Sequence, residues 1–166
     1  MRTVFFIPPL KKISGGLASI IELASMLAES GRNVAAVSPV DECPAIGMLG
    51  KSVRILPWGR TNTWSFLDKN DLWCIPDGWP NALVPGMRVQ ARTLMYVQNW
   101  VFMITSRPQG VAWSQLPLDY LSVSAPVDWF MREILGLSPL GILPPSIRPF
   151  FFSATAKNSK RIRVAW

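Results

Sequence analysis

Short apolar runs alternate with an amphipathic stretch along the first 37 residues. Residues 4–7 (VFFI) form one run, which ends at two prolines, and residues 34–37 (VAAV) form another. Between them, apolar residues recur at the three- and four-residue spacing of one buried helix face, at Leu17, Ile20, Ile21, Ala24, Leu27 and Ala28. This pattern predicts a strand, a helix and a second strand, which together form a βαβ unit.

The ends of this first helix carry capping residues. Ser14 and Gly16 are candidate caps at its start, and Gly31 is placed to stop it in the left-handed conformation that glycine adopts without strain. Further along the chain, Ala125 and Pro126 open a second helix, which Gly136 closes.

More apolar runs follow, each trailed by proline, glycine, asparagine or serine, at 53–56, 72–75, 93–97, 120–124 and 142–143. We expect strands buried on both faces. The helical candidates between them are 43–49, 81–92 (interrupted by Pro85 and Gly86), 100–105 and 127–135. Strands that alternate with helices predict an α/β fold: a Rossmann-like, doubly wound, mainly parallel sheet in three α/β/α layers.

The length of 166 residues suits one core of ordinary size. We expect one domain over residues 1–152, then a polar linker and the start of a further domain over 153–166, because the final RIRVAW reads as a strand with no helix after it.

The loop after the first strand, PPLKKISGG, is the first candidate site, because ligands of open parallel sheets bind beyond the carboxyl ends of the strands. Gly15 and Gly16 let a ligand approach the backbone, the helix start after Ser14 offers free amides, and Lys11 and Lys12 add charge. The loop matches neither GxGxxG nor GxxxxGK[ST], and its glycines also suit a plain turn.

Two later loops carry polar and aromatic side chains. In PDGWP, Asp77 is a candidate acceptor for sugar hydroxyls or a base, and Trp79 is a candidate for stacking on a sugar ring, although the segment also has turn composition. In the QNW segment, Gln98 and Asn99 suit a neutral polyhydroxylated ligand, with Trp100 as a second stacking candidate; helix capping is the equal alternative. For Ser124, helix capping is favoured.

The formal net charge of +7 is concentrated in the last residues, where no acid follows Glu133. That basic block suits either a solvated linker, which we favour, or attraction to phosphate in a nucleotide, nucleic acid or anionic lipid. Eight tryptophans are many for one domain, so some belong to the core, and others suit sugar stacking or a membrane interface.

Several classes of site are disfavoured. The chain contains no histidine, which excludes Ser/His/Asp and Cys/His triads. Cys43 and Cys74 have neither zinc-site nor disulfide-framework spacing, so we expect no metal and no cofactor. No apolar run reaches the length of a membrane span, and the first residues lack a signal-peptide cleavage site. A reducing cytoplasm fits these features.

The order of segments resembles the N-terminal domain of a GT-B glycosyltransferase of the retaining type. The segment IPPLKKISGGLASIIELASMLAESGRNVAAVSP is similar to the opening strand, Gly-Gly loop, helix and second strand of that family. YVQNW resembles its fifth-strand segment, YLSVSAPVDWFMREILG the later unit in which Ser follows a strand, and ILPPSIRPFF the approach to the interdomain linker. The resemblance covers nearly the whole chain and rests on the order of weak motifs.

The resemblance implies an acceptor-side half of a glycosyltransferase. Its partners would be a nucleotide-sugar donor, held by a C-terminal domain that this chain does not contain, and a glycan, lipid-linked or small-molecule acceptor; no nucleic acid is expected. The match of the Gly-rich loop nominates Gly15 and Gly16 at the cleft near the donor diphosphate. Many members use a histidine that is lacking here, so no catalytic residue is assigned, and the chain alone would be inactive. The alternatives are a stand-alone α/β module that binds a nucleotide or sugar phosphate, and a peripheral membrane interaction domain.

Overall fold

The computed structural model describes residues 1–59 and 64–146. Its strands are β1 (Thr3–Phe6), β2 (Val34–Val37), β3 (Arg54–Leu56), β4 (Leu72–Pro76), β5 (Arg92–Val97) and β6 (Leu118–Ser122). Its α-helices are α1 (Gly15–Glu29), α2 (Leu83–Val89), α3 (Trp100–Thr105) and α4 (Ala125–Trp129), and α4 continues into a π-helical turn over Phe130–Ile134. Short 3-10 turns lie at Ile46–Met48, Pro80–Ala82 and Trp113–Gln115.

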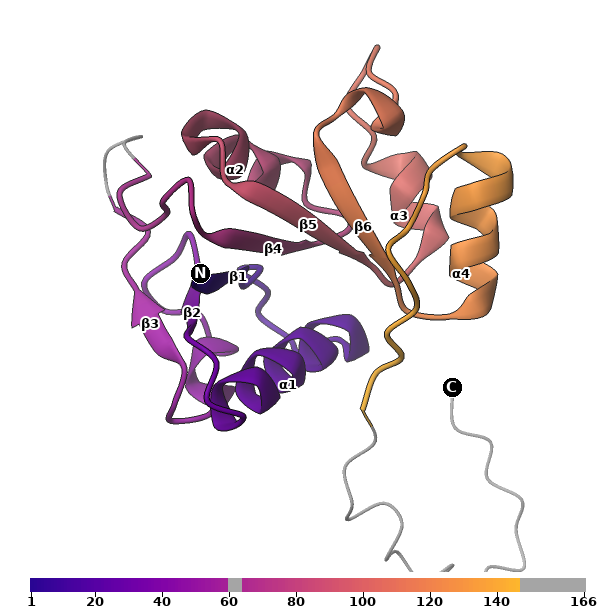
Figure 1. Ribbon diagram of the computed structural model, residues 1–166. Helices are drawn as coiled ribbons and strands as arrows, with labels where there is room; N and C mark the ends of the chain where they lie inside the picture. Colours follow the sequence, from indigo (N-terminus) through magenta and orange to yellow (C-terminus); the bar gives the residue numbers. More distant parts are fainter. Residues whose placement is uncertain (60–63, 147–166) are drawn as a thin grey trace, which may run out of the picture.

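All six strands belong to one sheet in the order β3-β2-β1-β4-β5-β6, and every neighbouring pair is parallel. The chain winds outward from β1 to β3, returns to the other side of β1, and then winds outward again from β4 to β6 (Figure 1). The predicted Rossmann-like, doubly wound α/β fold is therefore confirmed, with a sheet that is parallel throughout the described residues.

The alternation of side chains along each strand divides the core into two layers. Val4 and Phe6 of β1 point into a cluster that includes residues of α2, α3 and α4, whereas Phe5 points into a second cluster with α1 and the β2–β3 connection. Figure 1 shows α1 on one side of the sheet and α2 on the other. Each face of the sheet thus has its own apolar cover, as the three-layer prediction requires.

The predicted ends of α1 are confirmed. Ser14 is the N-cap residue, and its Oγ accepts a hydrogen bond from the Leu17 amide at 3.2 Å. After the helix, Gly31 adopts a φ of 82°, in the left-handed region. The helix therefore starts at Ser14, one of the two candidate caps; the other candidate, Gly16, is the second residue of the helix, so its expected capping role is wrong.

The second crossover helix runs through the two residues that were expected to interrupt it. Pro85 lies in the first turn of α2. Backbone amides of a first turn have no acceptor within the helix, so a proline there costs no helical hydrogen bond. Gly86 packs against the sheet so closely that a Cβ would lie 2.3 Å from Thr93 Oγ1 and 2.7 Å from Trp73 Cδ1. Glycine here permits close helix–sheet packing, and the predicted interruption is wrong.

Several expected elements are shorter or different. The helix expected over 43–49 is reduced to the 3-10 turn Ile46–Met48, and β3 is an exposed edge strand, not one buried on both faces. The strand expected over 142–143 is a single parallel bridge between Ile142 and Ser122. The expected boundary at residue 152, the linker and strand over 153–166 and the basic block after Glu133 (from Arg148 on) lie outside the described residues.

Ser124 occupies the N-cap position of α4, but its side chain makes no capping hydrogen bond. Pro126, the second helical residue, has no amide hydrogen to donate to it. The side-chain interaction near this helix start comes instead from Ser122, whose Oγ donates to Asp128 Oδ1 at 2.9 Å. Ser124 is therefore the N-cap residue, as expected, but its side chain does not take part in the cap.

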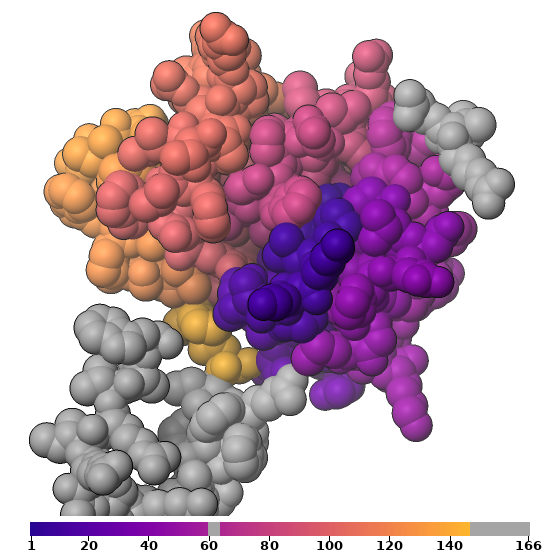
Figure 2. Space-filling view, turned by 180° about the vertical axis from the view of Figure 1, so that it is seen from behind, coloured from indigo at the N-terminus to yellow at the C-terminus, as the bar shows by residue number. Residues whose placement is uncertain are grey.

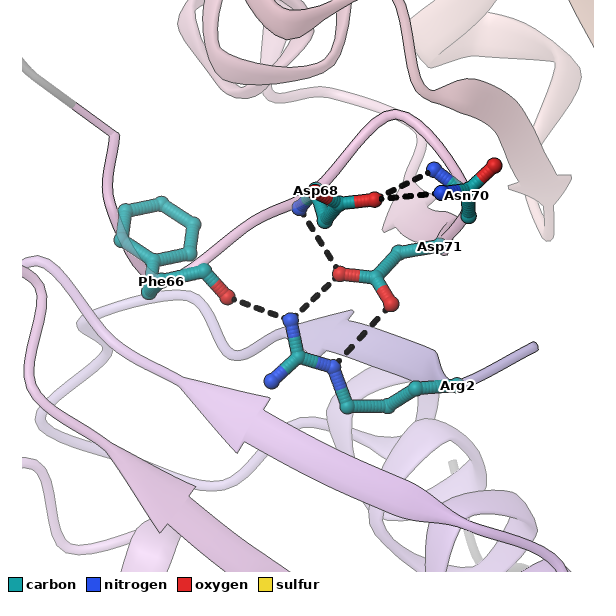
Figure 3. A network of polar contacts seen from close by, with 5 residues as sticks. All are labelled: Arg2, Phe66, Asp68, Asn70 and Asp71. Carbon is teal, nitrogen blue, oxygen red and sulfur yellow. Dashed lines mark hydrogen bonds and ion pairs between the residues drawn. The ribbon is translucent and has the colours of Figure 1, made fainter.

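A polar network at the amino edge of the sheet joins the start of β1 to the loop before β4 (Figure 3). The Arg2 guanidinium forms an ion pair with the Asp71 carboxylate, and Arg2 also donates to the Phe66 carbonyl at 2.9 Å. The same carboxylate accepts a hydrogen bond from the Asp68 amide at 2.8 Å. The Asp71 side chain is only 7% exposed, so these donors replace the water that a carboxylate contacts at the surface.

We expect Asp71→Ala to lower the free energy of unfolding by about 2–3 kcal/mol, because it leaves the part-buried Arg2 guanidinium and the Asp68 amide without their acceptor. Urea denaturation provides the measurement. The matched control is Asp119→Ala, which removes the exposed pair with Arg92 and should cost less than about 1 kcal/mol. Equal losses in the two variants would contradict the structural role of the network.

Candidate functional site

A cleft with a volume of about 520 Å³ opens at the carboxyl edge of the sheet. Segments that follow β1, β4 and β5 surround it. The lining residues are Pro8, Leu10, Ser14, Gly16, Leu17, Ile20, Pro76, Asp77, Gly78, Trp79, Gln98, Asn99 and Phe102. The structure therefore brings together Ser14, Gly16, Asp77, Trp79, Gln98 and Asn99, which the sequence nominates from three separate loops.

The position of the cleft follows from the strand order. The chain leaves β1 toward the helix on one face of the sheet and leaves β4 toward the helix on the other face. The segments after these two neighbouring strands consequently diverge, and a crevice remains between them. This is the place where open α/β sheets bind their ligands.

Asp77 follows β4 at the floor of the cleft and is 5% exposed. Its Oδ2 accepts hydrogen bonds from the backbone amides of Asn99 at 2.8 Å and Gln98 at 3.1 Å. Gly78, the next residue, has a φ of 80°, which confirms the turn composition of this segment. The first role of the carboxylate is thus to hold the residues after β5 in position beside the residues after β4.

Burial raises the pKa of Asp77 to about 6, although the hydrogen bonds from Asn99 and Gln98 oppose that rise. The carboxyl therefore changes its charge close to neutral pH. Its charge also acts on Tyr96, whose pKa is raised chiefly by burial and further by the Asp77 carboxylate. A carboxyl with a pKa of about 6 in a cleft has the property of a group that donates or accepts a proton.

Gln98 and Gly16 connect β5 with the first turn of α1. The side-chain Nε2 of Gln98 donates a hydrogen bond to the Gly16 carbonyl at 3.0 Å. A Cβ at position 16 would lie 2.1 Å from Gln98 Oε1, so only glycine permits this approach. A Cβ at Gly15 would instead meet no heavy atom of a non-neighbouring residue within 4 Å, and the two glycines therefore differ in their packing.

The remaining polar groups of the cleft have identifiable tasks. Asn99 is the N-cap residue of α3 and accepts from the Val101 amide at 3.0 Å, so its predicted capping role is confirmed, while its Nδ2 group is not used in that bond. Among the described residues, no group accepts a hydrogen bond from the amides of Gly15 and Gly16, as expected for the first turn of a helix. Gly16 and Ser14 line the cleft, whereas Gly15, which the sequence also nominates, does not.

The two expected stacking residues lie in different surroundings. Trp79 lines the cleft, and its ring centroid is 6.0 Å from that of Phe6 in the core. Trp100 does not line the cleft; it is 45% exposed on α3, and its ring centroid is 5.2 Å from that of Phe130. Trp73 and Trp113 are buried, in line with the expectation that some tryptophans belong to the core.

Sequence reasoning missed the apolar walls of the cleft. Leu17 and Ile20 are expected only on the buried face of α1, and no pattern in the sequence singles out Leu10 or Phe102. Phe102 packs 3.4–3.7 Å from the Cβ position of Gly78, which brings α3 over the turn after β4. The available signal for Phe102 was its position in the first turn of a helix that directly follows a strand, where ligands of such sheets bind.

No metal site is found in the described part of the chain, where no three residues of the ligating types His, Cys, Asp and Glu are grouped. Cys43 and Cys74 are both buried and unpaired, and burial raises the pKa of the Cys74 thiol to about 12. None of the helices over the described ranges combines the length and the apolar character of a membrane span.

Comparison of the chain with protein-family models, with curated proteins and with solved structures finds no match. The comparisons therefore identify no family.

Gly16→Ala should displace the Gln98 side chain, because the added methyl group occupies the position of Gln98 Oε1. The loss of the hydrogen bond costs about 1 kcal/mol and is partly offset by the higher helix propensity of alanine. We expect a changed NMR signal of the Gln98 side-chain amide and a net stability change below about 1 kcal/mol. Gly15→Ala is the control and should leave that signal in place; identical spectra of the two variants would refute the proposed contact.

Asp77→Asn should change how stability depends on pH. The folded pKa of about 6 lies above the ordinary value of 3.8, so the folded protein retains a proton that the unfolded chain releases. Asp77 therefore lowers stability progressively as pH rises from about 4 to 6, by up to about 3 kcal/mol. The neutral amide keeps an acceptor for the Gln98 and Asn99 amides and should remove this decline.

The measurement for Asp77→Asn is urea denaturation of wild type and variant at several pH values, with the difference between the two curves as the readout, since the other carboxyls contribute equally to both. A difference that does not vary between about pH 4 and 7 would contradict the raised pKa.

Proposed function

We propose that this chain is the acceptor-side half of a glycosyltransferase that uses a nucleotide-sugar donor. One observation supports the proposal above the others: the cleft between β1 and β4 gathers uncharged hydrogen-bonding groups around an aromatic ring and one buried carboxyl. Ser14, Gln98 and Asn99 supply the uncharged groups, Trp79 the ring and Asp77 the carboxyl. The order of segments along the chain, which resembles retaining GT-B enzymes, is the second support.

The chemistry of these groups matches a sugar. Hydroxyl groups both donate and accept hydrogen bonds, and so do carboxamides such as those of Gln98 and Asn99. Gln98 Oε1 accepts no hydrogen bond within the described residues, and in the proposal it accepts one from a sugar hydroxyl. The apolar edge of a sugar ring suits contact with Trp79 and with the aliphatic walls of the cleft.

The reaction would be completed by a donor half that this chain does not contain. In the proposed transfer, an acceptor hydroxyl forms a bond to the anomeric carbon while the bond from that carbon to the nucleoside diphosphate breaks. The hydroxyl proton passes to the departing phosphate oxygen, so no base from this chain is required. Asp77, tied to the amides of Gln98 and Asn99, acts as a positioning residue for the acceptor. The chain alone is then inactive in transfer and has weak affinity for acceptors.

We propose a cytoplasmic location for the protein. Its two cysteines are unpaired and buried, and such free thiols are typical of proteins from reducing compartments.

A stand-alone module that binds a nucleotide or sugar phosphate is the second candidate. The observation in its favour is the free amides of Gly15 and Gly16 at the start of α1, with Lys11 and Lys12 just before them. A phosphate would interact with these groups, whereas a neutral acceptor would interact mainly with Gln98 and Asn99.

The two candidates are separated by NMR titration of the 166-residue chain. With neutral methyl glycosides and disaccharides, the glycosyltransferase proposal expects saturable shifts of the Gln98 and Asn99 side-chain amides, with a Kd of about 1–10 mM. The side-chain amides of Gln90 and Gln115, which lie at the ends of α2 and of the Trp113–Gln115 turn, should not move.

Gln98→Ala should weaken the glycoside response at least about fivefold, which corresponds to the loss of one hydrogen bond. Gln90→Ala is the matched control. Shifts produced by inorganic pyrophosphate at Gly15 and Gly16, with no response to any neutral glycoside, would overturn the acceptor proposal in favour of the phosphate-binding module.

A further inference from the structure

An exposed apolar surface lies beside the mouth of the cleft. We call it the α3/α4 patch; its members are large apolar side chains that are 38–59% exposed: Trp100, Val101, Phe102, Ile104, Trp129 and Ile134. Contact between the Trp100 and Phe130 rings, with centroids 5.2 Å apart, joins the two helices. Figure 2 shows the salmon segment that contains α3 beside the orange segment that contains α4 on one face of the molecule.

The patch is continuous with the cleft. Phe102 belongs to both, because it lines the cleft, packs on Gly78 and is 46% exposed. The opposite rim is the short loop between two other lining residues, Leu10 and Ser14. That loop carries the exposed side chains of Lys11, Lys12 and Ile13. The mouth of the cleft therefore lies between an apolar helix and a loop with two cations.

The cations near this mouth are unpaired. Within the described residues, Arg2, Arg92 and Arg132 form ion pairs, whereas Lys11, Lys12 and Arg107, which follows α3, form none. On α4, Asp128 pairs with Arg132, and Glu133 also interacts with that arginine. Lys11, Lys12 and Arg107 carry three positive charges, whereas Asp128, Arg132 and Glu133 on α4 together carry one net negative charge. The balance around the patch is therefore positive, which is complementary to an anionic surface.

We propose that the α3/α4 patch and the Lys11–Lys12 loop dock on the surface of an anionic lipid bilayer, with the mouth of the cleft toward the lipid headgroups. Tryptophan is the side chain best suited to the headgroup region, because its ring is apolar and its indole N–H needs a polar partner. Trp100 and Trp129 both have exposed rings here, and Phe102, Ile104 and Ile134 supply the aliphatic and aromatic area that enters the acyl boundary.

Bilayer docking also narrows the substrate class. If the cleft binds an acceptor, a point that rests on the proposed function, then a mouth at the headgroups favours an acceptor carried on a lipid, with its polar head in the cleft and its tail left in the bilayer. The docking itself does not depend on that point, and vesicle binding tests it separately from the glycoside titration.

The test is cosedimentation of the full chain with phosphatidylcholine vesicles that contain about 30% phosphatidylglycerol. The double variant I104Q/W129Q should weaken binding at least about tenfold. M26Q/M48Q is the matched control, since Met26 and Met48 are similarly exposed but lie outside the patch, and it should bind as wild type. All variants keep the basic C-terminal residues, so that any binding through them cancels in the comparison.

The contribution of the cations is tested by comparing vesicle binding of K11Q/K12Q with that of K51Q/K69Q. Lys11 and Lys12 border the cleft, whereas Lys51 and Lys69 precede β3 and β4 at the other edge of the sheet. At low salt, the first pair of changes should weaken vesicle binding about tenfold and the second pair should not, and the difference should shrink at high salt. Circular dichroism of each variant shows whether it is folded.

Equal binding by I104Q/W129Q and M26Q/M48Q, both folded, would overturn the proposal. So would a failure of wild type to bind anionic vesicles together with a dimer, seen by analytical ultracentrifugation, that I104Q/W129Q abolishes, because a second copy would then cover the patch. Vesicle binding without any glycoside response would support docking while removing the acceptor proposal.

Discussion

The reversal of winding at β1 is the constraint on which the rest of the structure depends. Because β2 and β4 pair with opposite sides of β1, the crossovers of the two halves pass over opposite faces of the sheet. The segments after β1 and β4 are thereby forced apart at the carboxyl edge, and the cleft is what remains between them. Its polar groups come from distant parts of the sequence that only this topology brings together.

Hydrogen bonds between side chains and backbone groups hold the loops of the cleft in place. Asp77 fixes the Gln98 and Asn99 amides, and Gln98 in turn holds the carbonyl of Gly16 at the start of α1. The three segments are thus linked by hydrogen bonds across the crevice that separates them. Burial of the Asp77 carboxyl has an energetic cost, seen in its raised pKa, and the two amide donors offset part of it.

The sequence predicted the features that local patterns control. The apolar spacing in α1, the Ser14 cap and the left-handed Gly31 depend on neighbouring residues, and the structure agrees with all three. The prediction at Gly86 was wrong because the use of this glycine is tertiary: it fits against Trp73 on a neighbouring strand. The cleft residues that follow strands were found by position, whereas Phe102 was missed, because its place over Gly78 depends on how α3 packs.

The contact between Gly16 and Gln98 has an evolutionary consequence. A side chain at position 16 fits only if the residue at position 98 is shorter than glutamine or turns away, so a change at position 16 costs the contact with Gln98. Gly15, the preceding residue, has open space where a side chain would begin, so Gln98 does not restrict the residue type at that position. In related chains that keep this fold, glutamine at position 98 should therefore favour glycine at position 16, whereas the residue at position 15 should vary independently of position 98.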